Sequence, residues 1–238
     1  MTIAFISDLH LTPERPESKR LFERFIIDAH RYITRLYILG DLFEYWVGDD
    51  GADTLGHLDA EAAIRRAVDT GVEVLFLHGN RDFLIGNAFA ERTGCRLLPD
   101  PVVITHDGLR ILLTHGDALC TDDVEHQASR RQMLSGKWKL AFLEQPLARR
   151  METADAMRRR SEREKREKPM EIMDVNQDAV EALMREHDVR ILIHGHTHKP
   201  AAHEFEIDGE LARRYVLGDW YEQKSALYLD NGHLVLQR

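Results

Sequence analysis

Residues 5–10, Phe5-Ile-Ser-Asp-Leu-His10, join the end of an apolar run to two potential metal ligands. The apolar run from Ile3 to Ile6 predicts a short buried strand. Two side chains that can bind a metal ion, Asp8 and His10, follow it at a spacing of i and i+2. Side chains at that spacing in an extended segment point the same way. We therefore expect a carboxylate and an imidazole to face one point, although this motif alone is a weak signal.

The composition is that of an ordinary globular protein, with 43% hydrophobic and 31% charged residues among 238. The net charge of −9 argues against general nucleic-acid binding. Two cysteines without paired spacing, Cys95 and Cys120, favour a reducing compartment and no disulfide. No apolar run approaches the roughly 18 residues of a membrane helix, and the N-terminus lacks a basic signal segment. These features predict a cytoplasmic protein.

Four later apolar runs are likewise followed at once by residues that can bind a metal ion. The predicted strands 36–39, 72–77, 110–114 and 190–193 lead into Gly40-Asp41, Gly79-Asn80-Arg81, His115-Gly116 and Gly195-His196-Thr-His198. Helices predicted at 18–30, 57–70 and 83–92 separate the early strands, which indicates a mainly parallel sheet. Functional sites in such sheets form beyond the carboxyl ends of the strands. Each polar residue alone is more often a turn or packing residue, but the joint pattern is hard to attribute to chance.

The remaining regular elements are predicted from local patterns. Ser18 and Asp174 are expected to cap helices. Strands at 97–98, 102–105, 110–114, 204–208, 213–217, 225–229 and 232–236 are expected to form a second sheet. The turns at Asp107-Gly108 and 230–232 have hairpin composition.

Residues 122–169 differ in character from the rest of the chain. They show helical periodicity without strand signals, and residues 130–168 carry a net charge of +7, which leaves −16 elsewhere. One interpretation is a solvated helical hairpin. The other is a lid that handles an anionic, apolar ligand or contacts an anionic membrane surface.

The candidate ligands offer oxygen and nitrogen but no thiolate: Asp8, His10, Asp41, Asn80, His115, His196 and His198. Seven such ligands exceed what one zinc ion takes. They suit two ions that share a carboxylate, with Mn2+, Fe or Zn as candidates. Two ions of this kind bind a phosphoryl group between them and activate water for in-line attack.

The ordered motifs in residues 8–198 resemble those of the calcineurin-like metallophosphoesterases. The resemblance implies an α/β fold, namely a four-layer αββα sandwich formed by one domain, 1–238, with an inserted helical lid at 122–169. It also implies that Asp8, His10 and His198 hold a first ion. A second ion would be held by Asn80, His115 and His196, and Asp41 would bridge the two.

One position departs from the family pattern. The family usually has His after the Gly-Asn motif, where it assists a leaving alkoxide, whereas this chain has Arg81. Arginine cannot act as an acid near neutral pH, but it can stabilise anionic charge. A phosphate leaving group, with a pKa near ~6, needs no proton. Arg81 therefore favours cleavage of a diphosphate.

Longer segments, 79–83, 115–123, 172–176 and 194–200, resemble a family of Gram-negative bacterial hydrolases in lipid A biosynthesis. The resemblance implies two Mn2+ per chain and attack of water at the α-phosphorus of UDP-2,3-diacylglucosamine, which releases UMP and 2,3-diacylglucosamine 1-phosphate (lipid X). It implies catalytic roles for Asn80, Arg81 and His196. The implied substrate contacts are Asn80, Arg81, Asp123, Ser161, Lys165, Lys168 and His196.

The same resemblance implies a monomer bound peripherally to the cytoplasmic face of the inner membrane. Another dinuclear phosphoesterase, acting on a soluble nucleotide or a phosphoprotein, remains an alternative. A scaffold protein that kept the fold and lost the chemistry is a third interpretation, which the complete ligand set disfavours.

Overall fold

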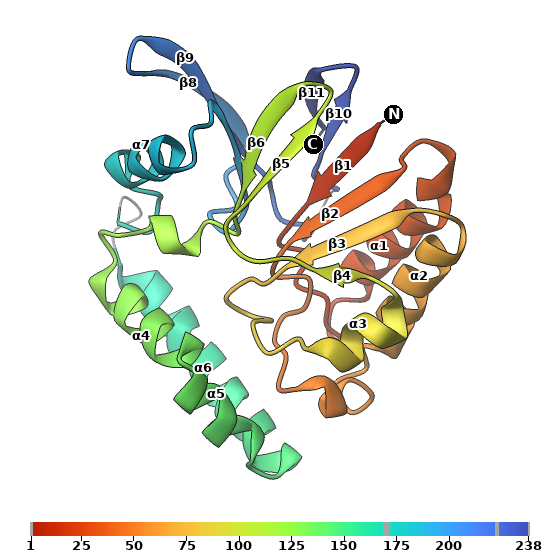
Figure 1. Ribbon diagram of the computed structural model, residues 1–238. Coiled ribbons are helices and arrows are strands. Elements are labelled where there is room, and N and C mark those ends of the chain that lie inside the picture. The colour runs from red at the N-terminus through yellow and green to blue at the C-terminus, as the bar shows by residue number, and fades with distance from the viewer. Residues whose placement is uncertain (1, 169–171, 222–223, 238) are drawn as a thin grey trace.

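The structure is a computed structural model that describes residues 2–168, 172–221 and 224–237, without the side chains of residues 162 and 165–167. Two β-sheets face each other, and helices lie outside them (Figure 1). The first sheet has the order β11-β10-β1-β2-β3-β4 and the second β5-β6-β7-β9-β8.

The elements have the following bounds. The first sheet contains β1 (Ile3–Ile6), β2 (Arg35–Leu39), β3 (Glu73–Leu77), β4 (Arg96–Leu97), β10 (Ala226–Asp230) and β11 (His233–Gln237). The second contains β5 (Val102–His106), β6 (Leu109–Leu113), β7 (Ile191–His194), β8 (Ala201–Ile207) and β9 (Glu210–Val216). The α-helices are α1 (Pro16–Asp28), α2 (Leu58–Asp69), α3 (Asn87–Thr93), α4 (Val124–Leu134), α5 (Gly136–Leu143), α6 (Leu147–Glu167) and α7 (Gln177–Glu186). Short 3-10 helices are η1 (Ala29–Arg31), η2 (Asp49–Gly51) and η3 (Asp117–Leu119).

Each central strand packs on both of its faces. Successive side chains of a strand point to opposite sides of the sheet. Phe5 of β1 therefore lies between the sheets, where its ring stacks on Tyr37 at 5.1 Å, while Ile6 joins the core beneath α1 and α2. In the second sheet Leu192 packs outward with Met184 of α7. The result is a helix–sheet–sheet–helix sandwich, which confirms the predicted fold class.

Strands β1, β2 and β3 are parallel, as are β6 and β7. The assignment of β4, β10 and β11 to the second sheet was wrong, because all three belong to the first. β10 runs antiparallel to β1, with Ile3 opposite Leu229. Alternation in the sequence identifies such strands but cannot say which of two facing sheets they extend.

Three predicted helix starts were also wrong. The helix expected from residue 83 begins at Asn87 and is α3. Helix α1 begins at Pro16, a residue that suits the first helical turn. Ser18 is buried within that helix and donates a hydrogen bond to the Trp220 carbonyl at 2.9 Å. Asn176 caps α7 by accepting from the Ala179 amide at 3.1 Å, whereas Asp174 forms an ion pair with Lys199.

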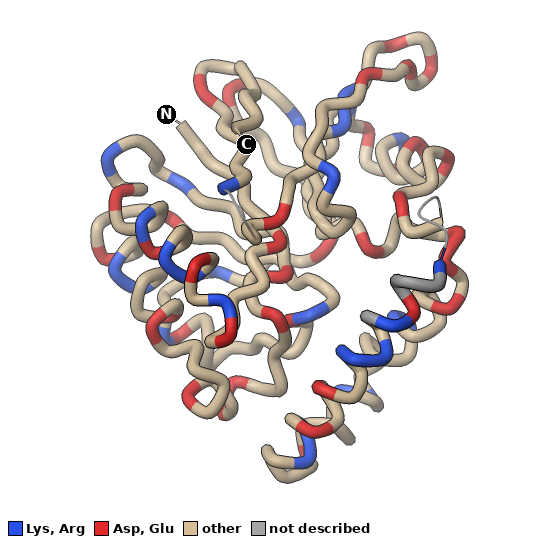
Figure 2. Tube along the Cα trace, turned by 180° about the vertical axis from the view of Figure 1, so that it is seen from behind, with Lys and Arg blue, Asp and Glu red and all other residues tan. Residues whose placement is uncertain are grey.

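The helices α4, α5 and α6 project from the sandwich as a separate arm, along which Lys and Arg recur (Figures 1 and 2). Arg130 of α4 forms an ion pair with Asp117 at 2.7 Å, and buried Arg150 of α6 donates to the Val47 carbonyl at 2.5 Å. Arg150 also pairs with Asp50. Apolar side chains of the arm also pack against the core, so polar and apolar contacts together fix the arm to the sandwich. Among the described residues, no helix combines the length and apolar character needed to cross a bilayer.

Candidate active site

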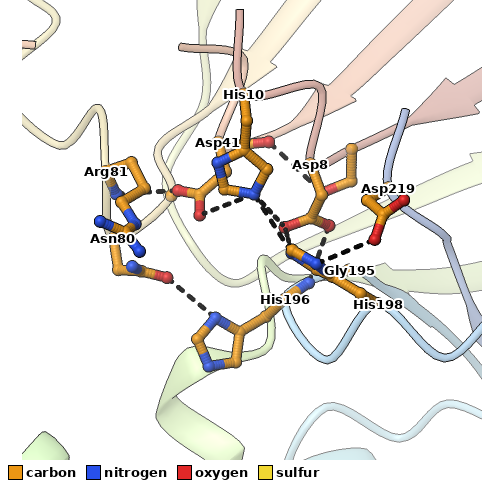
Figure 3. A network of polar contacts seen from close by, with 12 residues as sticks. Asp8, His10, Asp41, Asn80, Arg81, Gly195, His196, His198 and Asp219 are labelled. Carbon is orange, nitrogen blue, oxygen red and sulfur yellow. Dashed lines mark hydrogen bonds and ion pairs between the residues drawn. The ribbon is translucent and has the colours of Figure 1, made fainter. Parts of the chain in front are cut away.

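Five of the seven predicted ligands have left-handed backbone conformations. The φ angles are 57° at Asp8, 48° at His10, 51° at Asp41, 68° at His196 and 56° at His198. The extended geometry expected for the first pair was therefore wrong, since β1 already ends at Ile6. A left-handed residue other than glycine costs about 1–3 kcal/mol and concentrates at functional sites. These turns aim the side chains toward a common region beyond the strand ends (Figure 3).

Asp8, His10 and His198 form the first group. The Nε2 atoms of His10 and His198 lie 3.1 Å apart, and Asp8 Oδ1 lies 3.2 Å from His198 Nε2. Asp8 Oδ1 is buried and has no hydrogen-bond partner within the described part of the chain. The other oxygen, Oδ2, accepts from the His196 amide at 2.8 Å. Three potential ligand atoms thus converge from two different sheets.

Asp41 stands between this group and a second one. Its Oδ2 lies 3.9 Å from His10 Nε2, and its Oδ1 lies 3.7 Å from His115 Nε2. Asn80 Oδ1 lies 3.0 Å from His115 Nε2 and 2.8 Å from His196 Nδ1. One oxygen of Asp41 therefore faces each group, as a bridging ligand requires.

The electrostatics of the site call for positive charge. Burial alone would lower the pKa of His115, but the carboxylates of Asp41 and Asp8 raise it to about 9. Burial likewise opposes protonation of His198, yet Asp8 and Asp219 raise its pKa to about 9. Divalent cations would supply this charge in place of protons, and the groups Asp8–His10–His198 and Asp8–Asp41–His115 have the spacing to hold a metal ion. The residues fit a dinuclear metal centre.

Two of the predicted ligands have partners on their outer ring nitrogens. His115 Nδ1 donates to the Leu39 carbonyl at 2.8 Å, and His198 Nδ1 lies 3.1 Å from Asp219 Oδ2. Such partners fix the ring orientation and leave Nε2 for a metal. Sequence reasoning missed Asp219, although Gly218-Asp219 after β9 repeats the pattern of Gly40-Asp41.

Asp82 was also missed, and it ties two ligand-bearing loops together. Its buried carboxylate accepts from the amides of Gly79 at 2.8 Å, Leu42 at 2.8 Å and Asp41 at 3.3 Å. Burial and then the nearby charge of Asp41 raise the pKa of Asp82 to about 7. The loops after β2 and β3 are therefore positioned by one side chain.

A cavity of about 390 Å³ extends from these ligands to the arm. Its polar end includes His10, Asp41 and His198, and its other end is lined by apolar side chains of the arm and the core: Trp46, Phe83, Leu84, Met133, Trp138, Phe142 and Met157. Six of the seven predicted substrate contacts also line it: Asn80, Arg81, Asp123, Ser161, Lys168 and His196. The side chain of the seventh, Lys165, lies outside the described residues.

Gly40 provides a test of how closely the loop after β2 must approach the loop after β3. It has φ +86°, and a Cβ atom there would overlap the backbone of Gly79 and lie 2.8 Å from His115 Nδ1. Gly71 has a similar φ of +97° but open space around it. We expect Gly71→Ala to cost about 1–2 kcal/mol of unfolding free energy from backbone strain alone. Gly40→Ala should cost roughly 3–5 kcal/mol, because overpacking adds to that strain.

Urea denaturation of the two glycine variants measures this difference. Equal losses at Gly40 and Gly71 would contradict the packing explanation.

The calcineurin-like phosphoesterase family profile matches residues 1–200. Because this match covers most of the chain, the protein belongs to the calcineurin-like phosphoesterase family.

Relatives at high identity define the group more narrowly, and they are named UDP-2,3-diacylglucosamine hydrolase. The protein from Aromatoleum aromaticum is 49% identical over 97% of this chain and 94% of its own. The one from Pseudomonas paraeruginosa is 50% identical over 98% of this chain and 97% of its own. That from Aeromonas salmonicida is 48% identical over 100% of this chain and 93% of its own.

Proposed function

We propose that the protein hydrolyses the diphosphate bond of UDP-2,3-diacylglucosamine to give UMP and 2,3-diacylglucosamine 1-phosphate, a step of lipid A biosynthesis. The cavity carries this proposal, because it joins a polar, ligand-rich end to an apolar end lined by Trp138, Phe142 and Met157. A substrate with a diphosphate and two acyl chains needs both ends. The names of the relatives support the same substrate. A soluble nucleotide or a phosphoprotein would leave the apolar end without a use.

The proposed metal is Mn2+, with two ions per chain. Asp8, His10 and His198 would hold one ion, Asn80, His115 and His196 the other, and Asp41 both. When bound, the ions would stabilise charge on the phosphoryl oxygens and lower the pKa of the attacking water. The carboxylate, amide and imidazole ligands suit Mn2+.

Arg81 is proposed to bind the diphosphate beside Asn80 and His196. Its side chain is 14% exposed and lines the cavity next to Asn80. A guanidinium group binds phosphate oxygens through paired N–H donors and keeps its charge during the reaction. Attack at the α-phosphorus releases the sugar 1-phosphate, whose pKa near ~6 makes an acid unnecessary.

Substitution Arg81→Ala tests this role. We expect kcat/KM for UDP-2,3-diacylglucosamine to fall about 10²–10³-fold, as for the loss of other charge-stabilising donors. Manganese content should stay unchanged, because Arg81 offers no metal ligand. Arg96→Ala, at the exposed edge strand β4, is the matched control and should keep full activity. Loss of metal from the Arg81 variant would instead assign Arg81 a structural role.

The arm formed by α4–α6 is proposed to act as a lid, inserted at 122–169 into a single domain. Its apolar side would cover the acyl chains. Its basic residues, with Asp123, Ser161 and Lys168 at the cavity, would contact the anionic part of the lipid. Lys168 Nζ forms an ion pair with Asp123 Oδ1 at 2.7 Å, so binding of a substrate phosphate would compete with that pair. We further propose that the protein is a monomer that binds peripherally to the cytoplasmic face of the inner membrane.

Hydrolysis of UDP-2,3-diacylglucosamine with Mn2+ in ¹⁸O-labelled water tests the reaction, with UDP-N-acetylglucosamine as the control substrate. Cleavage of the acylated substrate alone, with label in UMP, is the expected result. Label in the sugar phosphate would place the attack at the β-phosphorus. Absence of cleavage by the metal-loaded protein would refute the proposed substrate.

A further inference from the structure

Glu44 is a buried carboxylate close to the proposed metal site, but it is neither a proposed metal ligand nor a proposed substrate contact. It lies three residues after Asp41, and its side chain is 11% exposed. Its amide donates to the Leu11 carbonyl at 3.1 Å, next to a β-bridge between Leu11 and Phe43. The backbone of Glu44 is therefore fixed to the loop that carries His10.

Three groups that are cationic or carry N–H donors surround this carboxylate. Arg15 forms an ion pair with Oε2 and also donates to the His10 carbonyl at 2.9 Å. His10 Nδ1 lies 3.7 Å from Oε2. Arg81 Nη1 approaches the other oxygen, Oε1, at 3.9 Å. A buried carboxylate needs such compensation, since an unpaired buried charge is strongly destabilising.

The position of Glu44 beside His10 indicates a specific chemical role. His10 is 2% exposed, and its Nε2 faces the proposed metal ligands Asp8 and His198. An imidazole that binds a cation through Nε2 carries its proton on Nδ1. His10 Nδ1 has no hydrogen-bond partner in the described part of the chain, and Glu44 is the carboxylate that it faces. Glu44 thus faces the outer ring nitrogen of His10 as Asp219 faces that of His198, although at 3.7 Å rather than 3.1 Å.

We propose that Glu44 is a positioning residue that holds His10 with one carboxylate oxygen and Arg81 with the other. The proposal deepens the proposed function and rests on it for the role of Arg81. It joins the metal-binding side of the site to the phosphate-binding side through a single carboxylate. Arg15 keeps that carboxylate in place without reaching the cavity lining itself.

Glu44→Gln tests the proposal because it preserves the shape of the side chain and removes its charge. In a titration that records free Mn2+ by electron paramagnetic resonance, affinity should fall about 10–100-fold, as for other partners of metal-bound histidines. At saturating Mn2+, kcat/KM should fall at least tenfold. In the Arg81→Ala background the same substitution should change kcat/KM less than threefold, because the two residues act as a unit.

Glu14→Gln is the matched control, since Glu14 is an exposed acid on the neighbouring loop and should give wild-type values. Unchanged Mn2+ affinity in Glu44→Gln would overturn the proposal, as would effects of Glu44 and Arg81 that simply multiply. The metal titration needs no substrate, so it stands apart from the proposed function. If the wild-type protein fails to cleave UDP-2,3-diacylglucosamine, the proposed function is wrong, and the double-mutant cycle is then measured with bis-p-nitrophenyl phosphate.

Discussion

Asp41→Ala is expected to lower hydrolysis of UDP-2,3-diacylglucosamine by at least about 10³-fold and to release bound Mn2+. Asp41 is the carboxylate whose two oxygens face the two ligand groups, at 3.9 Å from His10 and 3.7 Å from His115. Without it, both of the proposed ions would lose a ligand at once. The charge stabilisation that they supply would then be lost, and this is the largest contribution expected in a phosphoryl-transfer site.

The measurement combines metal content by mass spectrometry with turnover at saturating Mn2+. Asp208→Ala is the control, because Asp208 has the same left-handed backbone, with φ 55°, but lies exposed in the turn between β8 and β9. A variant of Asp41 that keeps two ions and normal turnover would refute the bridging role. The variant loses the hydrogen bond that Asp41 Oδ1 accepts from the Arg81 amide at 2.8 Å. Unfolding is not expected, because the amides of residue 41, Leu42 and Gly79 keep Asp82 as their acceptor.

Phe142→Arg should lower turnover of the acylated substrate by about 10²-fold or more and leave turnover of bis-p-nitrophenyl phosphate unchanged. Phe142 is 4% exposed, stacks on Trp138 at 4.7 Å and lines the apolar end of the cavity. A guanidinium group there would place charge where the acyl chains are proposed to lie, and burial of an unpaired charge is costly. The polar end, where the reacting phosphate is proposed to bind, would be unchanged.

Leu140→Arg is the matched control on the same helix. Leu140 is 66% exposed and does not line the cavity. It should therefore leave both substrates unaffected. The melting temperature of Phe142→Arg should fall, because the new charge is buried in the core cluster. Equal loss of both substrates would contradict a role confined to the acyl chains.

The sequence predicted the architecture well where one physical rule dominates. The runs that end in Asp8, Asp41 and Asn80 are buried on both faces, so their apolar character alone identified three neighbouring parallel strands. The later strands depended on long-range pairing. Nothing local distinguishes β10, which pairs with β1, from β9, which pairs with β7.

The candidate site likewise contains some residues that the sequence predicted and others that it did not. The predicted ligands lie together because strand ends of both sheets meet, as the position of Asp41 between His10 and His115 illustrates. Asp82 and Glu44 were not predicted, since a residue that contacts a loop or another side chain has no spacing rule of its own. Its role depends on which loop it reaches, and only the folded chain defines that. Asp219 was missed although Gly218-Asp219 repeats the pattern of Gly40-Asp41.

The left-handed backbone at the proposed ligands has an evolutionary consequence. Glycine and asparagine adopt that conformation more readily than histidine does, so local conformational preference does not favour histidine at positions 10, 196 and 198. We expect selection for the proposed reaction to maintain histidine there. In a gene copy released from that selection, we expect these three positions to drift toward glycine or asparagine early, and the resulting protein to gain stability while it loses the proposed metal site.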